Sequence, residues 1–221
     1  MKKLCAALIG LAALGACAYV AMTNLRSGQD FLLEQAIEAQ VAGMLKPYDF
    51  VGLEVMVCGS SSPLPDPTRA QACIMVRAGD QMFVVDSGSG SNTVMLANGA
   101  PYQLFRGLLL THFHSDHIDG LGEVLMTRWA QHTEGQRLTV HGPTGVSNVL
   151  NGFKMAYEAD NGYRTAHHGA ATMPPELAGA DVNEFTVQKG STTTVLQQPD
   201  LLIEAFAVNH QPINPAVGYR I

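Results

Sequence analysis

The chain has 221 residues, of which 47% are hydrophobic and 14% charged, and its formal net charge is −6. This composition excludes an intrinsically disordered chain, which combines few apolar residues with many charges. The acidic balance argues against a nucleic-acid binder held by bulk positive charge. The length suits one domain, or two small ones.

Residues 1–22 have the pattern of an export signal. Lys2 and Lys3 precede an uncharged run, residues 4–22, that is rich in Ala and Leu. Removing this segment removes two lysines and no acid, so the remainder has 11 basic and 19 acidic residues and a net charge of −8. We therefore expect an exported protein whose remaining surface is more acidic than the whole chain suggests.

Two fates of this segment stay open. Residues 14–17 (LGAC) resemble a bacterial lipoprotein cleavage box, in which Cys17 would be lipidated and become the first residue of the mature chain. The uncharged run is also just long enough to remain as a membrane anchor. Either fate predicts a periplasmic protein attached to the membrane.

Hydrophobic spacing predicts the elements of the rest of the chain. Residues 23–50 are expected to form a linker with an amphipathic helix from Asp30 to Leu45, which Lys46 and Pro47 end. Strands are expected at 52–60, 72–79, 81–88, 105–112, 137–143, 184–189, 192–197, 201–208 and from 218 onward, and helices at 92–97, 120–131 and 144–160. The Gly- and Pro-rich segment 161–180 is expected to be irregular. Strands that precede helices indicate an α/β or mixed architecture for residues 51–221.

Cys58 and Cys73 are expected on consecutive strands. An oxidising compartment would allow them to pair, whereas two buried free thiols fit the sequence equally well. The sequence leaves both alternatives open.

The strongest signal is THFHSDH at residues 111–117, directly after an apolar strand. His112 and His114 are two residues apart, so at a strand end both rings project to the same side. Asp116 and His117 lie beyond the strand and can turn back toward the same space. Imidazole and carboxylate suit a divalent ion such as Zn²⁺. Because four ligands crowd a single tetrahedral ion, we expect two adjacent ions.

This loop resembles the metal loop of the metallo-β-lactamase superfamily of hydrolases. FVVDSG at 83–88 resembles the strand and Asp-x-Gly that precede the loop in that family. GPTG at 142–145 resembles the Gly-Pro turn of its ribonuclease Z and arylsulfatase-like branch, and Asn209-His210 with PAVGYR at 215–220 resembles the third-histidine motif. The similarity covers roughly residues 51–221 and implies an αββα sandwich.

Position by position, the resemblance implies a role for each matching residue. His112, His114 and His210 would bind the first Zn²⁺, and Asp116 and His117 would belong to a second. Asp116 is also the candidate catalytic residue. In the same way Asp86 would orient the loop through hydrogen bonds. The competing interpretations are an Asp86 that caps a turn and a solvated loop histidine at position 210.

The other histidines carry weaker signals. His132 follows a predicted helix in a polar stretch and is expected to be solvated. His141 ends a strand beside Gly-Pro and is expected to be structural. His167 and His168 are expected on a surface loop, with a pocket-lining role as the alternative.

The resemblance implies a zinc-dependent hydrolase that uses metal-activated hydroxide on an anionic ester, either a phosphodiester or an aryl sulfate. Export and negative charge favour a small ester and disfavour nucleic acid. The alternative is a ribonuclease Z-type phosphodiesterase that acts on RNA. A non-catalytic binding module is a third class, which has no need of the full ligand set. Whether the protein forms a homodimer is left open.

The family places a bridging aspartate and a final histidine after the third-histidine motif. Neither follows His210 before Ile221. We therefore expect a C-terminally truncated form of the fold that lacks part of its second half. An inactive fragment is a further alternative.

Overall fold

The structure is a computed structural model that describes residues 19–20, 23–32, 35, 52–64, 66–132 and 134–221. The chain divides into two compact units, residues 1–48 and 49–221. In the first unit, residues 23–32 are helical apart from a bend at Leu25. Nearly all of the expected export segment and most of the expected helix at 30–45 lie outside the described residues. Within the described part of the chain, no helix has both the length and the apolar character needed to cross a membrane.

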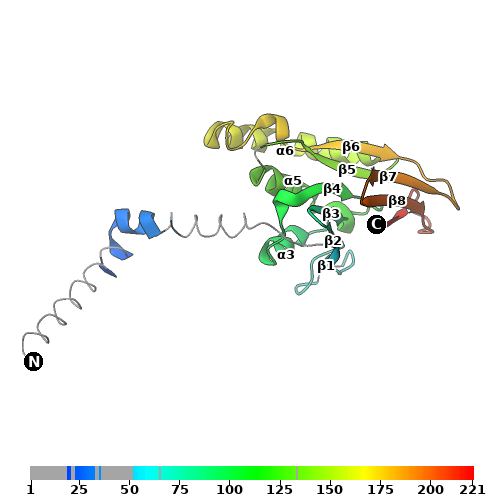
Figure 1. Cartoon of the computed structure of the whole chain (residues 1–221), viewed down its shortest axis with the longest axis horizontal. Helices are drawn as coiled ribbons and strands as arrows, with labels where there is room; N and C mark the ends of the chain where they lie inside the picture. Colours follow the sequence, from blue (N-terminus) through cyan, green and yellow to red (C-terminus); the bar gives the residue numbers. More distant parts are fainter. Residues whose placement is uncertain (1–18, 21–22, 33–34, 36–51, 65, 133) are drawn as a thin grey trace, which may run out of the picture. The chain divides into compact units, whose positions relative to one another are not determined.

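The second unit is built on a six-stranded mixed sheet in the order β1-β2-β3-β4-β5-β6 (Figure 1). The strands β1 to β3 are antiparallel, whereas β3 to β6 run parallel. Their bounds are β1 Leu53–Gly59, β2 Cys73–Ala78, β3 Gln81–Val85, β4 Phe105–Leu109, β5 Leu138–Pro143 and β6 Ala180–Phe185. Because parallel strands end at the same edge of a sheet, the loops after β3, β4 and β5 meet there.

A three-stranded antiparallel sheet covers one face of the large sheet. It consists of β7 (Thr192–Gln198), β8 (Leu201–Ala207) and β9 (Val217–Arg220). Phe83 of β3 and Leu109 of β4 pack with Val195, Ile203 and Ala205 of the small sheet, and all five are buried. These contacts form the core between the two sheets.

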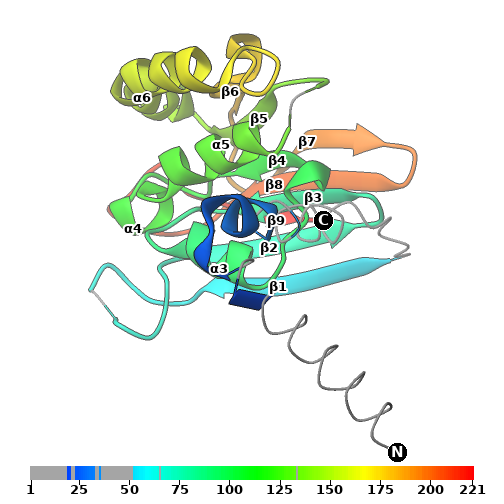
Figure 2. The ribbon, with the colours of Figure 1, turned by 90° about the vertical axis from the view of Figure 1, so that its left-hand side faces the viewer.

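Helices cover the other face of the large sheet, where Figure 2 shows α5 and α6 together. Met82 and Val84 alternate with Phe83 along β3 and therefore point to this side, where Leu121, Val124 and Leu150 join the same core. The helices are α3 Ser91–Ala97, α4 Ser115–Ile118, α5 Leu121–Ala130 and α6 Val146–His168, with short 3₁₀ turns η1 (Tyr102–Leu104) and η2 (Pro175–Leu177). The predicted α/β class is confirmed, in the layer order helix, sheet, sheet.

Four predicted boundaries are wrong. The strands expected at 81–88 and 105–112 end earlier, at Val85 and Leu109, because the chain turns there into the loops that carry Asp86 and His112. The helix expected at 144–160 continues to His168, so the first part of segment 161–180 is helical rather than irregular. Arg164 forms an ion pair with Asp160 one turn earlier, which supports the helix through this Gly-containing stretch. The strand expected at 184–189 begins earlier, as β6, because parallel pairing with β5 sets its register.

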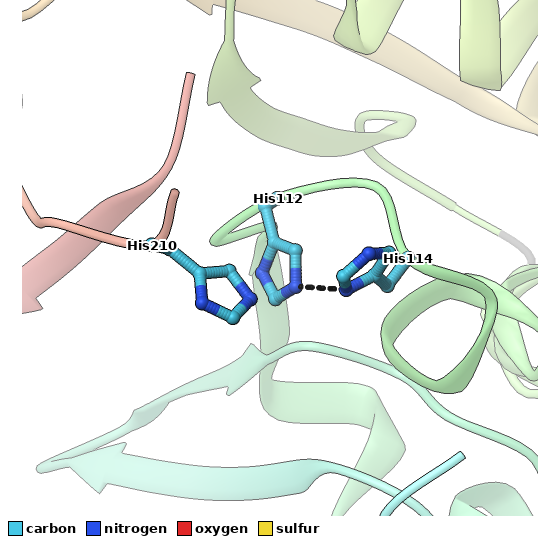
Figure 3. A group of neighbouring side chains, drawn as sticks. All are labelled: His112, His114 and His210. Atoms are coloured by element: carbon cyan, nitrogen blue, oxygen red, sulfur yellow. Dashed lines mark hydrogen bonds between the residues drawn. The ribbon is translucent and has the colours of Figure 1, made fainter. Parts of the chain in front are cut away.

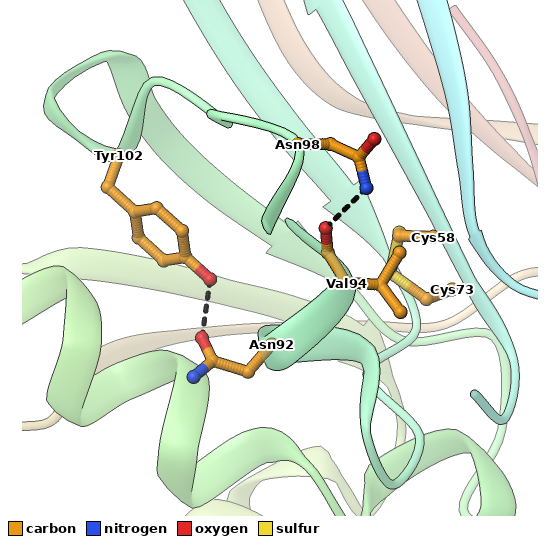
Figure 4. The surroundings of a disulfide bond; sticks show 6 residues. All are labelled: Cys58, Cys73, Asn92, Val94, Asn98 and Tyr102. Carbon is orange, nitrogen blue, oxygen red and sulfur yellow. Dashed lines mark hydrogen bonds between the residues drawn. A yellow bond between two sulfur atoms is a disulfide. The ribbon is translucent and has the colours of Figure 1, made fainter. Parts of the chain in front are cut away.

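Cys58 and Cys73 form a disulfide that joins β1 to β2, which decides between the two alternatives left open by the sequence (Figure 4). A register shift between Val57 and Gly59 places Cys58 beside Cys73. Both cysteines are buried in the core under the helices, where Val94 of α3 packs against them. The bond therefore fixes the edge strand to the rest of the large sheet.

The outer strand β1 has one uncovered apolar face. Leu53, Val55 and Val57 are each more than half exposed, and Ile74, which pairs with Val57 across the register, is 41% exposed. Because side chains alternate along a strand, these residues lie on the face that carries β7 to β9 elsewhere in the sheet. In the described part of the chain, none of these four side chains belongs to the core between the two sheets.

Candidate metal centre

The loop after β3 begins with Asp86, a buried residue whose φ is 58°. Asp and Asn adopt this left-handed conformation more readily than other residues with a Cβ, and such strain concentrates at functional sites. The backbone N–H of Asp86 donates to the Leu109 carbonyl (3.0 Å), which continues the pairing of β3 with β4. The turn therefore directs the carboxylate toward the loop that follows β4.

The Asp86 carboxylate holds that loop at two residues. Its Oδ1 accepts the backbone N–H of Thr111 (2.8 Å), and its Oδ2 accepts the Thr111 hydroxyl (2.7 Å). The same Oδ2 lies 2.7 Å from Nδ1 of His117. Asp86 therefore fixes both ends of the segment that carries the predicted ligands, which is the orienting role that the resemblance implies.

Thr111 continues the hydrogen-bond chain from Asp86 to His112. Its hydroxyl donates to Asp86 and lies 3.0 Å from His112 Nδ1, so it accepts the Nδ1 proton. The free nitrogen of His112 is then Nε2, which lies 3.0 Å from Nδ1 of His114 (Figure 3). Burial, followed by the charge of His117, lowers the pKa of His112 to about 4. His112 is therefore a neutral imidazole at pH 7, the form that binds a metal ion.

His210 reaches the same place from the segment between β8 and β9. Ligand nitrogens of His112, His114 and His210 all lie within 4.8 Å of one another. Figure 3 shows the three rings converging, with His210 approaching from the opposite side to His114. The ring centroids of His112 and His210 are 4.7 Å apart. Three imidazoles, two from the loop after β4 and one from a distant part of the chain, fit the donor set of a zinc ion.

The strand β9 fixes the position of the His210 segment. The Tyr219 hydroxyl donates to the Leu110 carbonyl (2.7 Å), and the Val217 N–H donates to the Thr111 carbonyl (3.0 Å). Burial, followed by the charge of Asp86, raises the pKa of Tyr219, so this phenol remains a proton donor. The Gly-Tyr-Arg motif therefore binds the metal loop to the small sheet.

Asp116 and His117 lie beside the three histidines, on the one-turn helix α4. Asp116 is 4% exposed, and its Oδ2 is 3.6 Å from His117 Nε2. Burial lowers the pKa of His117, but the hydrogen bond and charge of Asp86 and the charge of Asp116 outweigh it, so the net shift is upward. With Nδ1 directed at Asp86, Nε2 is free to act with Asp116 as a second pair of metal donors.

Gly88 and Gly120 let the loops approach closely. A Cβ on Gly88 would lie 2.1 Å from the Asp116 carbonyl oxygen, and one on Gly120 would lie 2.5 Å from the Gly88 carbonyl oxygen. The backbone of Ser87 bridges the two loops, because its N–H donates to the His117 carbonyl and its carbonyl accepts the Gly120 N–H, both at 2.8 Å. Backbone contacts with the loop after β3 therefore fix the position of the metal loop.

The structure brings all six sequence-predicted site residues together and adds three that sequence reasoning missed. Thr111, Gly88 and Tyr219 stood inside the quoted motifs, but their partners could not be identified from spacing. The lipidation candidate Cys17 lies outside the described residues.

The remaining histidines are distributed as follows. His141 is buried and contacts Asn183, which confirms a structural position. His132 is half-buried rather than solvated. His167 and His168 are exposed, as expected, but they end helix α6 instead of lying on a loop.

Comparison with known sequences gives two findings. Residues 53–152 match the family model described as Anti-Pycsar protein Apyc1. Ribonuclease Z of Mycobacterium marinum is 36% identical over 171 residues, which are 76% of this chain and 58% of that protein. Ribonuclease Z of Mycolicibacterium gilvum is 38% identical over 171 residues, 76% of this chain and 57% of the relative. The chain therefore spans little more than half the length of these curated relatives.

Comparison with solved structures agrees on the fold. The human tRNase Z short form has a TM-score of 0.56 at 19% identity and is matched over 75% of this chain and 63% of its own. The metallo-β-lactamase-fold protein YhfI from Bacillus subtilis has a TM-score of 0.51 at 18% identity, over 76% and 57%. The second unit has the metallo-β-lactamase fold, as the resemblance implied.

Proposed function

Because the chain belongs to the metallo-β-lactamase-fold superfamily, in its ribonuclease Z branch, we propose that it is a metal-dependent hydrolase of phosphodiester bonds. The observation that carries this proposal is the convergence of His112, His114 and His210 beside Asp116 and His117. The hydrogen bonds of these side chains leave ring nitrogens and a carboxylate available to a metal ion. His114 and His210 are exposed, so a structural role in the core does not account for their position.

The three histidines would hold one divalent ion, and Asp116 with His117 would hold a second. Zinc is the ion that best suits this donor set. When bound, such ions act as Lewis acids and lower the pKa of water toward about 7. The residues fit this purpose because His112 is neutral, and because Asp86 holds His117 with its Nε2 free.

The side chains of the chain itself would carry out the other tasks. Asp116 is a buried carboxylate beside the free Nε2 of His117 and would accept the proton of the attacking water, while the bond between phosphorus and the leaving oxygen breaks. Asp86 and Thr111 would keep His112 and His117 in the productive tautomers. His114 and His210 are exposed, so a substrate can approach from this side of the site.

The relatives favour a phosphodiester over the aryl sulfate that sequence reasoning placed beside it. The two curated relatives are named ribonuclease Z, which makes RNA the first polymer to test and weighs, though weakly, against the expectation from export and charge that nucleic acid is disfavoured. The net charge of −6 still favours a short or small phosphodiester, since a chain with this balance repels a long polyanion.

The test is a substrate panel with the zinc-loaded full chain: bis(4-nitrophenyl) phosphate, a short RNA, the matched DNA and 4-nitrophenyl sulfate. We expect hydrolysis of the phosphodiesters, abolished by a chelator and restored by Zn²⁺. His114→Ala should abolish it, whereas His168→Ala should leave it unchanged because His168 lies at the end of α6. Turnover of the sulfate alone, or of nothing on the panel, would contradict the proposal.

We also propose that the protein is exported and attached to the membrane through residues 1–22. The disulfide between Cys58 and Cys73 supports an oxidising compartment. Mass spectrometry of the protein from a bacterial membrane fraction distinguishes the fates: a lipid on Cys17, or an intact N-terminus. An unmodified, uncleaved chain in the cytosolic fraction would count against both.

A further inference from the structure

A polar cavity of about 450 Å³ lies at the end of the large sheet opposite to the metal centre. It is bordered by the first residues of β3, β4 and β5 and by the last residues of β7. Because β4 runs from Phe105 at the arginine end of the cavity toward Thr111 at the metal loop, these two points are roughly 20 Å apart at about 3.3 Å per residue, while His141, which pairs with Leu109, lies at the nearer end of the cavity. The cavity is therefore separate from the proposed active site.

Positive charge surrounds this cavity in an otherwise acidic protein. Arg106, Arg128 and Arg137 line it, and Asp80 is the only carboxylate among the described lining residues. Arg137 is already engaged, because it pairs with Asp181 and donates two hydrogen bonds to a backbone carbonyl of η2. The charges of Arg106 and Arg128 remain.

Arg128 is the feature that most requires a ligand. It lies on α5 and is 5% exposed, and its Nε donates to the Phe105 carbonyl (3.0 Å). Arg106 Nη1 donates to the Gln103 carbonyl (3.3 Å). Across the described part of the chain, no carboxylate forms an ion pair with either guanidinium. A buried cation without a counter-ion is costly, and an anion in the cavity would remove that cost.

The pKa shifts of Arg128 and His132 are consistent with unpaired positive charge at the cavity. Burial, with the charge of Arg106 adding to it, lowers the pKa of Arg128 to about 10. Burial, followed by the charges of Arg128 and Arg106, lowers the pKa of His132 to about 4. The cations in this region therefore repel one another without compensation from a nearby acid.

The cavity also offers a neutral donor. His141 lines it, and the Asn183 amide nitrogen lies 2.9 Å from His141 Nδ1. Because an amide nitrogen donates, Nδ1 accepts and the imidazole proton lies on Nε2. Gly107 leaves room beside this nitrogen, since a Cβ there would lie 3.1 Å from it. The lining therefore offers the His141 Nε2–H as a donor in addition to the two guanidinium groups.

We propose that this cavity is a binding site for a phosphate monoester, held by Arg106 and Arg128. A phosphate monoester carries nearly two negative charges at pH 7, which matches two unpaired guanidinium groups. Guanidinium binds phosphate oxygens in bidentate fashion, with more geometric specificity than an ammonium group. The volume exceeds that of the phosphate alone and lies in the range of sites for small organic ligands.

The experiment measures binding of two probes, inorganic phosphate and ribose 5-phosphate, to the full chain by calorimetry. Because a metal centre also attracts phosphate, binding is measured on the protein before and after removal of metal by a chelator. The variants are Arg106→Glu, which changes an exposed side chain, and Arg128→Gln, whose folding is checked by circular dichroism. Arg164→Gln on α6 is the matched control.

We expect saturable binding that persists in the metal-free protein and is at least about tenfold weaker in Arg106→Glu and in folded Arg128→Gln. Arg164→Gln should bind like the unaltered chain. Tighter binding of ribose 5-phosphate than of inorganic phosphate would identify the organic ester as the ligand, and equal binding would identify the phosphate group alone. The proposal fails if binding disappears with the metal, or if Arg106→Glu binds both probes normally.

Discussion

Asp86 is the residue whose alteration tests the organisation of the site most sharply. Its carboxylate accepts three hydrogen bonds: from the Thr111 N–H, from the Thr111 hydroxyl and from His117 Nδ1, at 2.7 to 2.8 Å. Asp86→Asn keeps the size of the side chain and, because Asn also tolerates the left-handed conformation, the turn. In one orientation, however, the amide nitrogen of the new side chain would face the Thr111 hydroxyl and His117 Nδ1, which now donate to Oδ2. In the flipped orientation it would face the Thr111 N–H.

The loss of one charge-assisted hydrogen bond costs about 1.5–3 kcal/mol, which corresponds to a 10- to 100-fold weaker metal affinity. We expect Asp86→Asn to weaken zinc binding by this factor in a competition assay against a chromophoric chelator. Asp160→Asn, on the exposed face of α6, is the control and should bind zinc normally. Zinc affinity and hydrolysis that are both unchanged in Asp86→Asn would refute the role assigned to this carboxylate.

Three further expectations concern the fold around the site. Gly88→Ala places a methyl group against the backbone of the metal loop and should destabilise the protein by about 1–3 kcal/mol in urea unfolding. The control Gly152→Ala, in open space on α6, should stabilise the protein by about 0.5–1 kcal/mol. Equal effects of the two substitutions would contradict the close approach of the loops at Gly88. Burial lowers the pKa of His141 to about 4. Below about pH 6.5 the unfolded chain therefore binds a proton at this residue that the native state does not bind. The free energy of unfolding should consequently fall by up to about 3 kcal/mol between pH 6.5 and pH 4. His141→Gln should reduce that slope, to which His112 and His132 also contribute, and an unaltered slope would show that His141 is not one of its sources. Reduction of the disulfide between Cys58 and Cys73, which encloses a short loop, should lower the free energy of unfolding by about 3 kcal/mol, and no change on reduction would mean that the bond does not form in solution.

Local patterns were sufficient for much of the fold. The strands β2 and β5 and the helices α3 and α5 lie close to their predicted bounds, and β3 and β4 begin where predicted but end three residues early. The boundary of α6 was missed because Gly162 and the following polar residues suggest a loop, whereas ion pairing between Arg164 and Asp160 supports a helix. The start of β6 was missed because its register depends on β5, far earlier in the chain.

The residues of the site likewise divide into those that a local motif predicts and those whose position depends on contacts between distant parts of the chain. His112 and His114 could be predicted as ligands from their motif, but the strand-end geometry expected for them is wrong, because β4 ends at Leu109 and both lie in the loop that follows. Position 210 depends on the contact of Tyr219 with Leu110, which no local pattern contains. Thr111 was missed for a similar reason, since its role depends on the tautomer that it imposes on His112.

The central claim is that His210 completes a metal centre begun by His112 and His114, and zinc binding measures this most directly. The full chain and two variants, His210→Ala and His168→Ala, would be stripped of metal and titrated with Zn²⁺ against a competing chelator. We expect tight binding by the full chain and by His168→Ala, and at least about tenfold weaker binding by His210→Ala, with all three folded. Equal zinc affinity in all three proteins, or no zinc binding by the unaltered chain, would contradict the assignment of this centre.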